Sequence, residues 1–243
     1  MRTTLEICCG NWESVCAAVQ GGADRIELCA ALPLGGITPT IGLLKQVKET
    51  FPTLPTHVLI RPREGDFVYT PEEIRAMLTD IHLCRQAGAD GIVSGALLPS
   101  GEIDVPATRL LIEAAQACSF TFHRAFDHTN DLPVALETLI NLGCTRLLTS
   151  GGASTAWQGM EKLSQLVKQA AGRLIVMAGA GISPTNARTI VKETGVTEIH
   201  ASCTVKQRSS NDQAPSLGKA DEGTIWVTQA QRVKELKNAI IDI

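Results

Sequence analysis

The chain has 243 residues, with 22 Lys and Arg against 25 Asp and Glu, so its formal net charge is −3. Hydrophobic residues make up 44% and charged residues 19% of the chain, which excludes disorder for its bulk. The near-neutral balance argues against a nucleic acid or an anionic membrane as partner, because binders of either normally carry a basic face. We therefore expect neither partner.

The sequence also predicts the cellular location of the protein. It contains no run of 18 or more apolar residues, so we expect no membrane span. Residues 1–6 lack the apolar stretch of a signal peptide, and a cytoplasmic location is the default expectation. The eight cysteines are then expected to stay reduced, because the cytosol disfavours disulfides.

A short β-type run followed by a helix-type segment repeats from one end of the chain to the other. The predicted strands cover residues 5–8, 25–29, 58–61, 91–94, 120–123, 146–150, 174–178 and 198–202. The predicted helices cover residues 13–20, 41–49, 71–86, 106–117, 132–141, 156–170, 184–193 and 228–240. Eight strands alternating with helices predict an α/β protein, a single (β/α)8 TIM barrel domain over residues 1–243. An open doubly wound sheet is disfavoured, since no Gly-x-Gly-x-x-Gly follows the first strand.

Capping residues predict where two of the helices begin. Thr70 and Ser183 each precede a proline, which predicts a capping residue followed by proline at the first helical position, Pro71 or Pro184.

Residues 204–223, between the last strand and the last helix, form a polar stretch without a clear period. We expect a loop there, acting as a lid, as a subunit contact or as a disordered segment.

The alternation of side chains along a strand predicts an unusually polar barrel interior. Apolar residues must face the outer helices, so their neighbours face inward. The predicted inward set is Glu6, Cys8, Arg25, Glu27, Cys29, Arg61, Thr121, His123, Glu198, His200 and Ser202. One interpretation is a salt-bridged plug, with Glu6 and Glu27 paired to Arg25 or Arg61, because buried charges need partners. The other is a functional site, since barrel active sites lie at the carboxyl ends of the strands.

Several residues at those ends are candidates for catalysis or anion binding. His123 could act as a general acid or base or as a metal ligand, oriented by Asp127 or by a carboxylate of the barrel interior. The Arg61 guanidinium could hold an anion. Glycine-rich turns after the sixth and seventh strands expose backbone N–H groups, so we expect them to bind an anion as well. The residues of these turns are Ser150, Gly151, Gly152, Gly179 and Gly181.

Two cysteines are candidates for a metal site. Cys8 and Cys29 are predicted to face inward at matching heights on adjacent strands, which lie about 4.8 Å apart. Two thiolates suit a soft cation such as Cu(I). A second interpretation treats both cysteines as small core residues, a common role for free cysteine.

The motifs together resemble the CutC copper homeostasis protein family. They are residues 5–8 (LEIC), 22–29 (GADRIELC), 35–39 (GGITP), 60–63 (IRPR), 65–67 (GDF), 121–127 (TFHRAFD), 148–151 (LTSG) and 177–182 (MAGAGI). The resemblance implies a cytoplasmic (β/α)8 barrel that is often oligomeric and handles copper. The family's proposed Cu(I) cysteines correspond to Cys8 and Cys29. The family often has Cys or Ser directly after its eighth-strand histidine, whereas here Ala201 and Ser202 follow His200.

Two functional hypotheses remain open at this stage. The first is a copper homeostasis protein that binds Cu(I) through Cys8 and Cys29, with His123 or His200 nearby. The second is an isomerase, lyase or hydrolase acting on a small anionic metabolite. Its candidate catalytic residues are Glu6, Glu27, Arg61, His123 and Asp127. We expect a homodimer or a higher homo-oligomer in either case.

Overall fold

Eight parallel strands, hydrogen-bonded in chain order, close into a barrel in the computed structural model, which describes residues 3–208 and 223–241. The predicted (β/α)8 barrel is confirmed, and each strand lies within three residues of its predicted position. The strands are β1 (Thr4–Cys9), β2 (Arg25–Leu28), β3 (Thr56–Leu59), β4 (Gly91–Ser94), β5 (Ser119–Phe122), β6 (Arg146–Thr149), β7 (Ile175–Ala178) and β8 (Glu198–Ala201).

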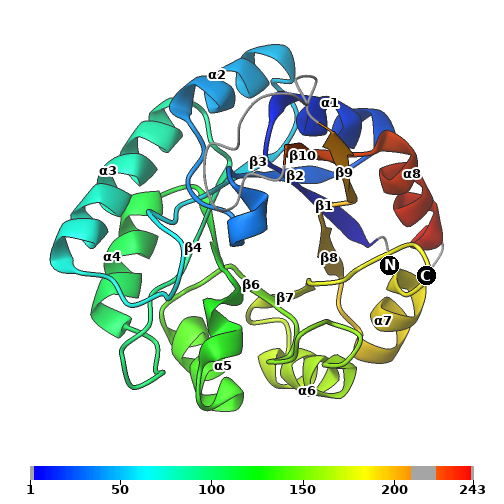
Figure 1. The fold of residues 1–243 in the computed structure, drawn as a ribbon. Helices are drawn as coiled ribbons and strands as arrows, with labels where there is room; N and C mark the ends of the chain where they lie inside the picture. The colour runs from blue at the N-terminus through cyan, green and yellow to red at the C-terminus, as the bar shows by residue number, and fades with distance from the viewer. Residues whose placement is uncertain (1–2, 209–222, 242–243) are drawn as a thin grey trace.

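The helices form a ring around the strands (Figure 1). They are α1 (Trp12–Gly21), α2 (Ile41–Thr50), α3 (Pro71–Gln86), α4 (Val105–Ala115), α5 (Leu132–Asn141), α6 (Met160–Ala170), α7 (Ala187–Thr194) and α8 (Ala230–Ala239). Two short 3₁₀ helices, η1 (Leu32–Leu34) and η2 (Arg124–His128), follow β2 and β5. None of the helices within the described residues is long and apolar enough to cross a membrane.

The main hydrophobic core lies between the strands and this ring of helices. Outward-facing strand residues such as Leu5 and Ile26 are fully buried against helix residues such as Val15 and Leu44. A second, smaller cluster lies inside the barrel and consists of Cys8, Cys29, Leu59 and Val93, with Leu32 packed against it. The two separate clusters agree with the alternation of side chains that the sequence predicts.

One predicted helix start is confirmed and another is wrong. Thr70 caps α3 through a reciprocal capping box with Glu73, and Pro71 occupies the first helical position. Pro184, in contrast, lies in a turn, and α7 begins three residues later at Ala187. The Asn186 side chain accepts from the Ser183 N–H at 2.8 Å and stabilises that turn.

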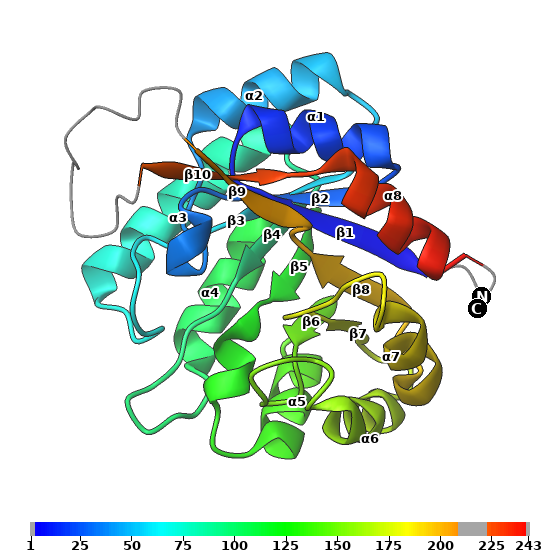
Figure 2. The same ribbon diagram turned by 45° about the vertical axis from the view of Figure 1, so that its right-hand side comes forward.

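The predicted polar loop contains a strand at its beginning. Residues Thr204–Arg208 form β9, which pairs antiparallel with β10 (Thr224–Thr228), and the ribbon projects beside the barrel (Figure 2). Because Thr228 pairs with Thr204, the last helix begins at Ala230 instead of residue 228. Residues 209–222 of the predicted loop lie outside the described residues, so its role as a lid or subunit contact stays a prediction.

The turn after β6 has a steric requirement that can be tested. A Cβ atom on Gly159 would lie 1.8 Å from the carbonyl oxygen of Ser150, whereas a Cβ on Gly42 of α2 would meet nothing within 4 Å. We expect Gly159→Ala to lower the free energy of unfolding by about 2 kcal/mol or more, because the backbone must shift. The matched control Gly42→Ala should leave stability unchanged or raise it by up to about 1 kcal/mol. Urea denaturation measures both, and equal stabilities of the two variants would contradict this packing.

Candidate functional site

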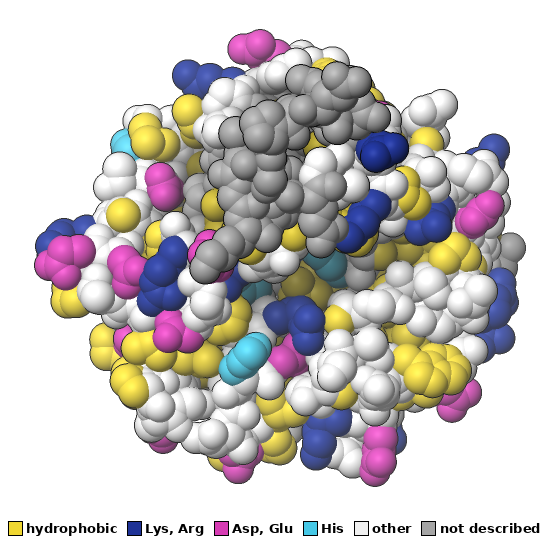
Figure 3. Space-filling view, viewed as in Figure 1, with side chains coloured by type: hydrophobic (Ala, Val, Ile, Leu, Met, Phe, Trp, Pro, Cys, Tyr) yellow, Lys and Arg dark blue, Asp and Glu magenta, His cyan; other side chains and the backbone are white. Residues whose placement is uncertain are grey.

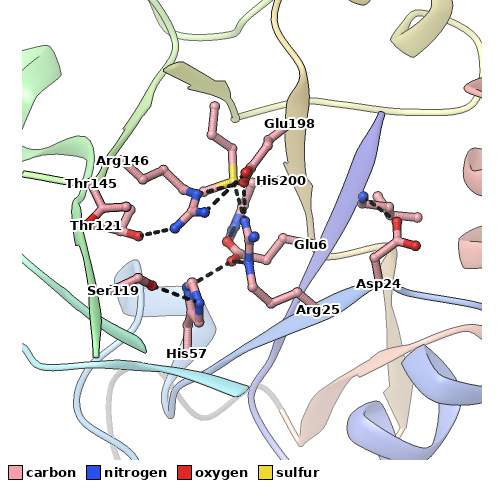
Figure 4. A network of polar contacts seen from close by, with 12 residues as sticks. Glu6, Asp24, Arg25, His57, Ser119, Thr121, Thr145, Arg146, Glu198 and His200 are labelled. Atoms are coloured by element: carbon pink, nitrogen blue, oxygen red, sulfur yellow. Dashed lines mark hydrogen bonds and ion pairs between the residues drawn. The ribbon is translucent and has the colours of Figure 1, made fainter. Parts of the chain in front are cut away.

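Four charged side chains form an ion-pair network inside the barrel (Figure 4). Arg25 Nε lies 2.5 Å from Glu6 Oε2, and Arg25 Nη2 lies 2.5 Å from Glu198 Oε2. Arg146 completes the network through Nε, 2.7 Å from Glu198 Oε2. Two carboxylates therefore balance two guanidiniums, which satisfies the requirement that buried charges be paired.

Two histidines extend this network from either side of Glu6. His200 Nδ1 lies 2.7 Å from Glu6 Oε1, and His57 Nδ1 lies 3.5 Å from Glu6 Oε2. Burial alone would raise the pKa of Glu6, but the hydrogen bond with His200 and the charge of Arg25 hold it well below its usual value. Burial lowers the pKa of His57 to about 4, so His57 is neutral near pH 7. Glu6 is thus an ionised, fully paired carboxylate.

The observed ion pairs agree with the predicted salt-bridged plug for Glu6 but not for Glu27. Glu6 pairs with Arg25 as that interpretation requires, but Glu27 pairs with neither Arg25 nor Arg61 among the described contacts. Sequence reasoning did not single out Arg146, although it opens the sixth predicted strand and its neighbour Leu147 faces outward. It also missed His57, because β3 begins two residues before the predicted strand.

Above the network, three potential ligand side chains converge. One ligand atom each of Cys8, Glu27 and His200 lies within 4.8 Å of the others. Burial raises the pKa of Glu27 to about 7. For His200, burial would lower the pKa, but the Glu27 and Glu6 carboxylates outweigh it and raise the pKa. This trio places a thiol, a carboxyl and an imidazole around one point.

Cys29 joins the trio through its sulfur, although not in the predicted register. The strands pair Cys8 with Glu27, so Cys8 and Cys29 do not stand at matching heights. The two sulfurs still approach diagonally to 3.6 Å. The contact with the Cys29 thiol, followed by burial, raises the pKa of Cys8 well above its usual value. The Cys8 thiol is therefore protonated at neutral pH when no metal is bound.

A cavity of about 480 Å³ opens above these residues at the mouth of the barrel. Figure 3 shows the molecule hollowed at its centre, with histidine and hydrophobic atoms visible inside the hollow. The cavity has the size of a small-molecule site. Its lining includes the trio, Arg61 and His123 among the polar residues, and Leu32, Phe67, Leu148 and Ile182 among the apolar ones.

His123 directly follows β5, but its ring hydrogen-bonds to a backbone group instead of the predicted carboxylate. Its Nδ1 accepts a hydrogen bond from the Ala125 N–H at 3.2 Å, so the proton of the neutral ring is on Nε2. Burial, followed by the charge of Arg61, lowers the pKa of His123 to about 3. The side chain is therefore a neutral hydrogen-bond donor at pH 7. Neither Asp127 nor a carboxylate of the barrel interior hydrogen-bonds to it among the described contacts.

Asp127 instead fills the glycine-rich turn after β6. Its carboxylate accepts from the backbone N–H groups of Ser150, at 3.1 Å, and Gly152, at 3.0 Å. The Gly151 N–H donates to Thr149 Oγ1 at 2.9 Å. The three N–H groups predicted to hold an external anion are thus bonded within the chain.

The other residues predicted to bind an anion lie in the turn after β7 and in the loop after β3. Gly181 lines the cavity, whereas the Gly179 N–H donates to the Thr149 carbonyl at 3.0 Å. The Arg61 guanidinium donates to the carbonyls of Leu34, Gly36 and Gly65, at 2.8 to 3.0 Å. Of the predicted anion-binding residues, Arg61 and Gly181 therefore face the cavity.

Comparison with known proteins assigns the family. Residues 3–205 match the model of the CutC family. The chain belongs to the CutC family. It is 46% identical to the family protein CutC of Bacteroides thetaiotaomicron, with 97% of each chain covered. It is 49% identical to that of Vibrio campbellii, with 99% of this chain and 100% of the relative covered.

Solved structures agree with the fold. The CutC structure from Streptococcus agalactiae is 32% identical, with a TM-score of 0.78 over 82% of this chain and 97% of that chain. The thiamine phosphate pyrophosphorylase of Pyrococcus furiosus has a TM-score of 0.59 at 18% identity, with 98% of this chain and 95% of that chain covered. At that identity the likeness concerns the barrel alone.

The ion-pair network predicts a specific pattern of stability losses. Arg25→Met should lower the free energy of unfolding by about 3–5 kcal/mol, because it leaves the buried Glu6 carboxylate without the guanidinium that pairs with it. The matched control Arg75→Met removes an arginine whose ion pair with Glu72 is exposed, so it should change stability little. Urea denaturation at pH 7 compares the two variants. If Arg25→Met were as stable as Arg75→Met, the ion pairs of Arg25 would not stabilise the fold.

Proposed function

We propose that the protein binds Cu(I) at the mouth of the barrel through Cys8 and Cys29. The observation that carries the proposal is the distance of 3.6 Å between the two sulfurs. Two metal–thiolate bonds of about 2.3 Å, the length found in zinc sites, can span that distance. Thiolates are also the ligands that Cu(I) prefers.

A third ligand can come from the trio. Of the two histidines proposed from the sequence, His200 has a ring nitrogen within 4.8 Å of the Cys8 sulfur. Its Nδ1 is turned to Glu6, and a carboxylate behind a ligating imidazole is a common arrangement in metal sites. We therefore assign the third position to His200 rather than to His123, with Glu27 beside it.

The family supports the same proposal. The Streptococcus agalactiae relative carries copper homeostasis in its name. We extend that role to this chain, as a cytoplasmic protein and a homo-oligomer that takes Cu(I) as its cargo. The reducing cytosol would keep both thiols available for the metal.

A second candidate function is the enzymatic one, an isomerase, lyase or hydrolase acting on a small anionic metabolite. The cavity of about 480 Å³ and the Glu27 carboxyl, with a pKa of about 7, favour it. Of the other proposed catalytic residues, Glu6 belongs to the ion-pair network and Asp127 fills a backbone turn. Arg61 and His123 remain as groups that could contact a substrate.

Copper binding can be tested by anaerobic competition between the reduced protein and a Cu(I) chelator. We expect one tightly bound Cu(I) per chain, with at least about a hundredfold loss of affinity in Cys8→Ser and in Cys29→Ser, since each removes a thiolate ligand. Affinity should rise with pH, because Cys8 must lose the proton that its raised pKa retains.

The matched control for this experiment is Cys144→Ser, which changes a buried thiol on the outer side of the barrel. Cys144 is 3% exposed and bonds to the Arg146 carbonyl, so serine can replace it. This variant should bind Cu(I) like the wild type. Unchanged affinity in both Cys8→Ser and Cys29→Ser would contradict the proposed site.

A further inference from the structure

Arg61 differs from the other buried arginines of the barrel in its partners. Arg25 and Arg146 each form ion pairs with carboxylates, whereas Arg61 donates to three backbone carbonyls and has no ion pair within the described residues. The carbonyls hold the guanidinium in place but do not neutralise it. Arg61 is only 5% exposed, so its charge lies at the cavity wall with little water to screen it. A buried charge without a counter-ion is unfavourable.

Two hydrogen-bond donors at this wall also lack partners. Arg61 Nε and His123 Nε2 are both buried and make no hydrogen bond in the structure. Because His123 Nδ1 already accepts from Ala125, the unpaired Nε2 is a donor. Buried donors without acceptors are rare in folded proteins and call for an explanation. Both atoms have less than 1 Å² of accessible surface, so an acceptor in the cavity reaches them only when their side chains turn toward it.

The two donors belong to one arrangement built around Phe67. The Arg61 guanidinium carbon lies 5.0 Å from the centre of the Phe67 ring, and the His123 ring centre lies 4.9 Å from it. Phe67 therefore fixes both side chains at the same wall. Gly35, with φ of +84°, allows this packing, since a Cβ there would lie 3.3 Å from Arg61 Nη1.

We propose that the cavity binds a small organic anion, a carboxylate or a phosphate ester, whose charged group is held by Arg61 and His123. The anion would supply the missing counter-charge, and a turn of the two side chains toward the cavity would let it accept from Nε of Arg61 and Nε2 of His123. Leu32, Leu148 and Ile182 line the same cavity and suit a short carbon skeleton. Cys8 lines the same cavity, but the anion would be held by other residues, and the proposal depends on neither copper binding nor a reaction.

The test uses the full-length, reduced, metal-free protein labelled with ¹⁵N-histidine. Inorganic phosphate and butyrate are titrated separately at constant ionic strength, and the ring signals of His123 are followed by NMR. The His123→Phe variant assigns these signals. We expect a saturable shift with at least one anion, and the anion that binds identifies the charged group as phosphate or carboxylate. No saturable shift with either anion overturns the proposal.

Variants then test which groups hold the anion. Arg61→Lys should weaken binding about tenfold or more, because lysine has a single point charge and cannot keep the guanidinium contacts. His123→Phe keeps a ring against Phe67 but removes the donor, and should also weaken binding about tenfold in calorimetry. The control Arg75→Lys, on the exposed face of α3, should bind like the wild type.

The outcomes separate this proposal from the copper site. Wild-type affinity for the anion in His123→Phe overturns the proposal, even if Arg61→Lys fails to fold. Cu(I) titration of the same His123→Phe protein should give wild-type affinity, since His123 lies outside the trio. Loss of Cu(I) binding in the cysteine variants with intact anion binding would confirm that the two sites are distinct.

Discussion

The pairing of charges inside a closed barrel is the constraint on which the rest of the site depends. Strands that close into a barrel leave no solvent beside their inward-facing residues, so each ionised group there needs a partner within reach. Glu6 and Glu198 find theirs in Arg25 and Arg146. Because Glu6 is held ionised, its second oxygen is available to hold His200 from below. The network thus links the bottom of the barrel to its mouth.

This arrangement divides the interior into two levels with different chemistry. In the lower level the Glu6 and Glu198 carboxylates are paired with the Arg25 and Arg146 guanidiniums, and this network supports the residues above it. The upper level contains the protonated Cys8 thiol, the Glu27 carboxyl with a pKa of about 7, and the Arg61 guanidinium, which has no ion pair within the described residues. Groups left in these states are ready to exchange a proton or accept a ligand. The division explains how one barrel can offer a soft-metal site and an anion site at the same mouth.

The architecture and the inward-facing residues could be predicted from the sequence because both follow from local periodicity. The strand–helix repeat defines the barrel, and alternation assigns Glu6, Cys8 and His200 to its interior. Which inward side chains meet could not be predicted, because that depends on the stagger between strands. The stagger pairs Cys8 with Glu27 and brings Cys29 in along a diagonal.

The same limit applies to residues that act outside the strands. A glycine-rich turn after a strand is typical of an anion site, but the sequence does not show whether an internal carboxylate occupies it. Asp127, twenty-three residues before Ser150, does so here. Conversely, the sequence assigns Arg61 to the barrel interior and makes it a candidate for holding an anion, but does not show whether a carboxylate of the chain pairs with it. The folded structure shows that its guanidinium is buried and that no carboxylate of residues 3–208 and 223–241 pairs with it.

X-ray absorption spectroscopy at the copper edge of the anaerobically Cu(I)-loaded protein can identify the atoms that bind the metal. We expect two sulfur neighbours at about 2.3 Å, a metal–thiolate bond length. One sulfur should be lost in Cys29→Ser, because the two thiols lie 3.6 Å apart and both bind the metal. A spectrum fitted by nitrogen and oxygen neighbours alone, or unchanged in Cys29→Ser, would contradict the assignment of the cysteine pair as the metal site.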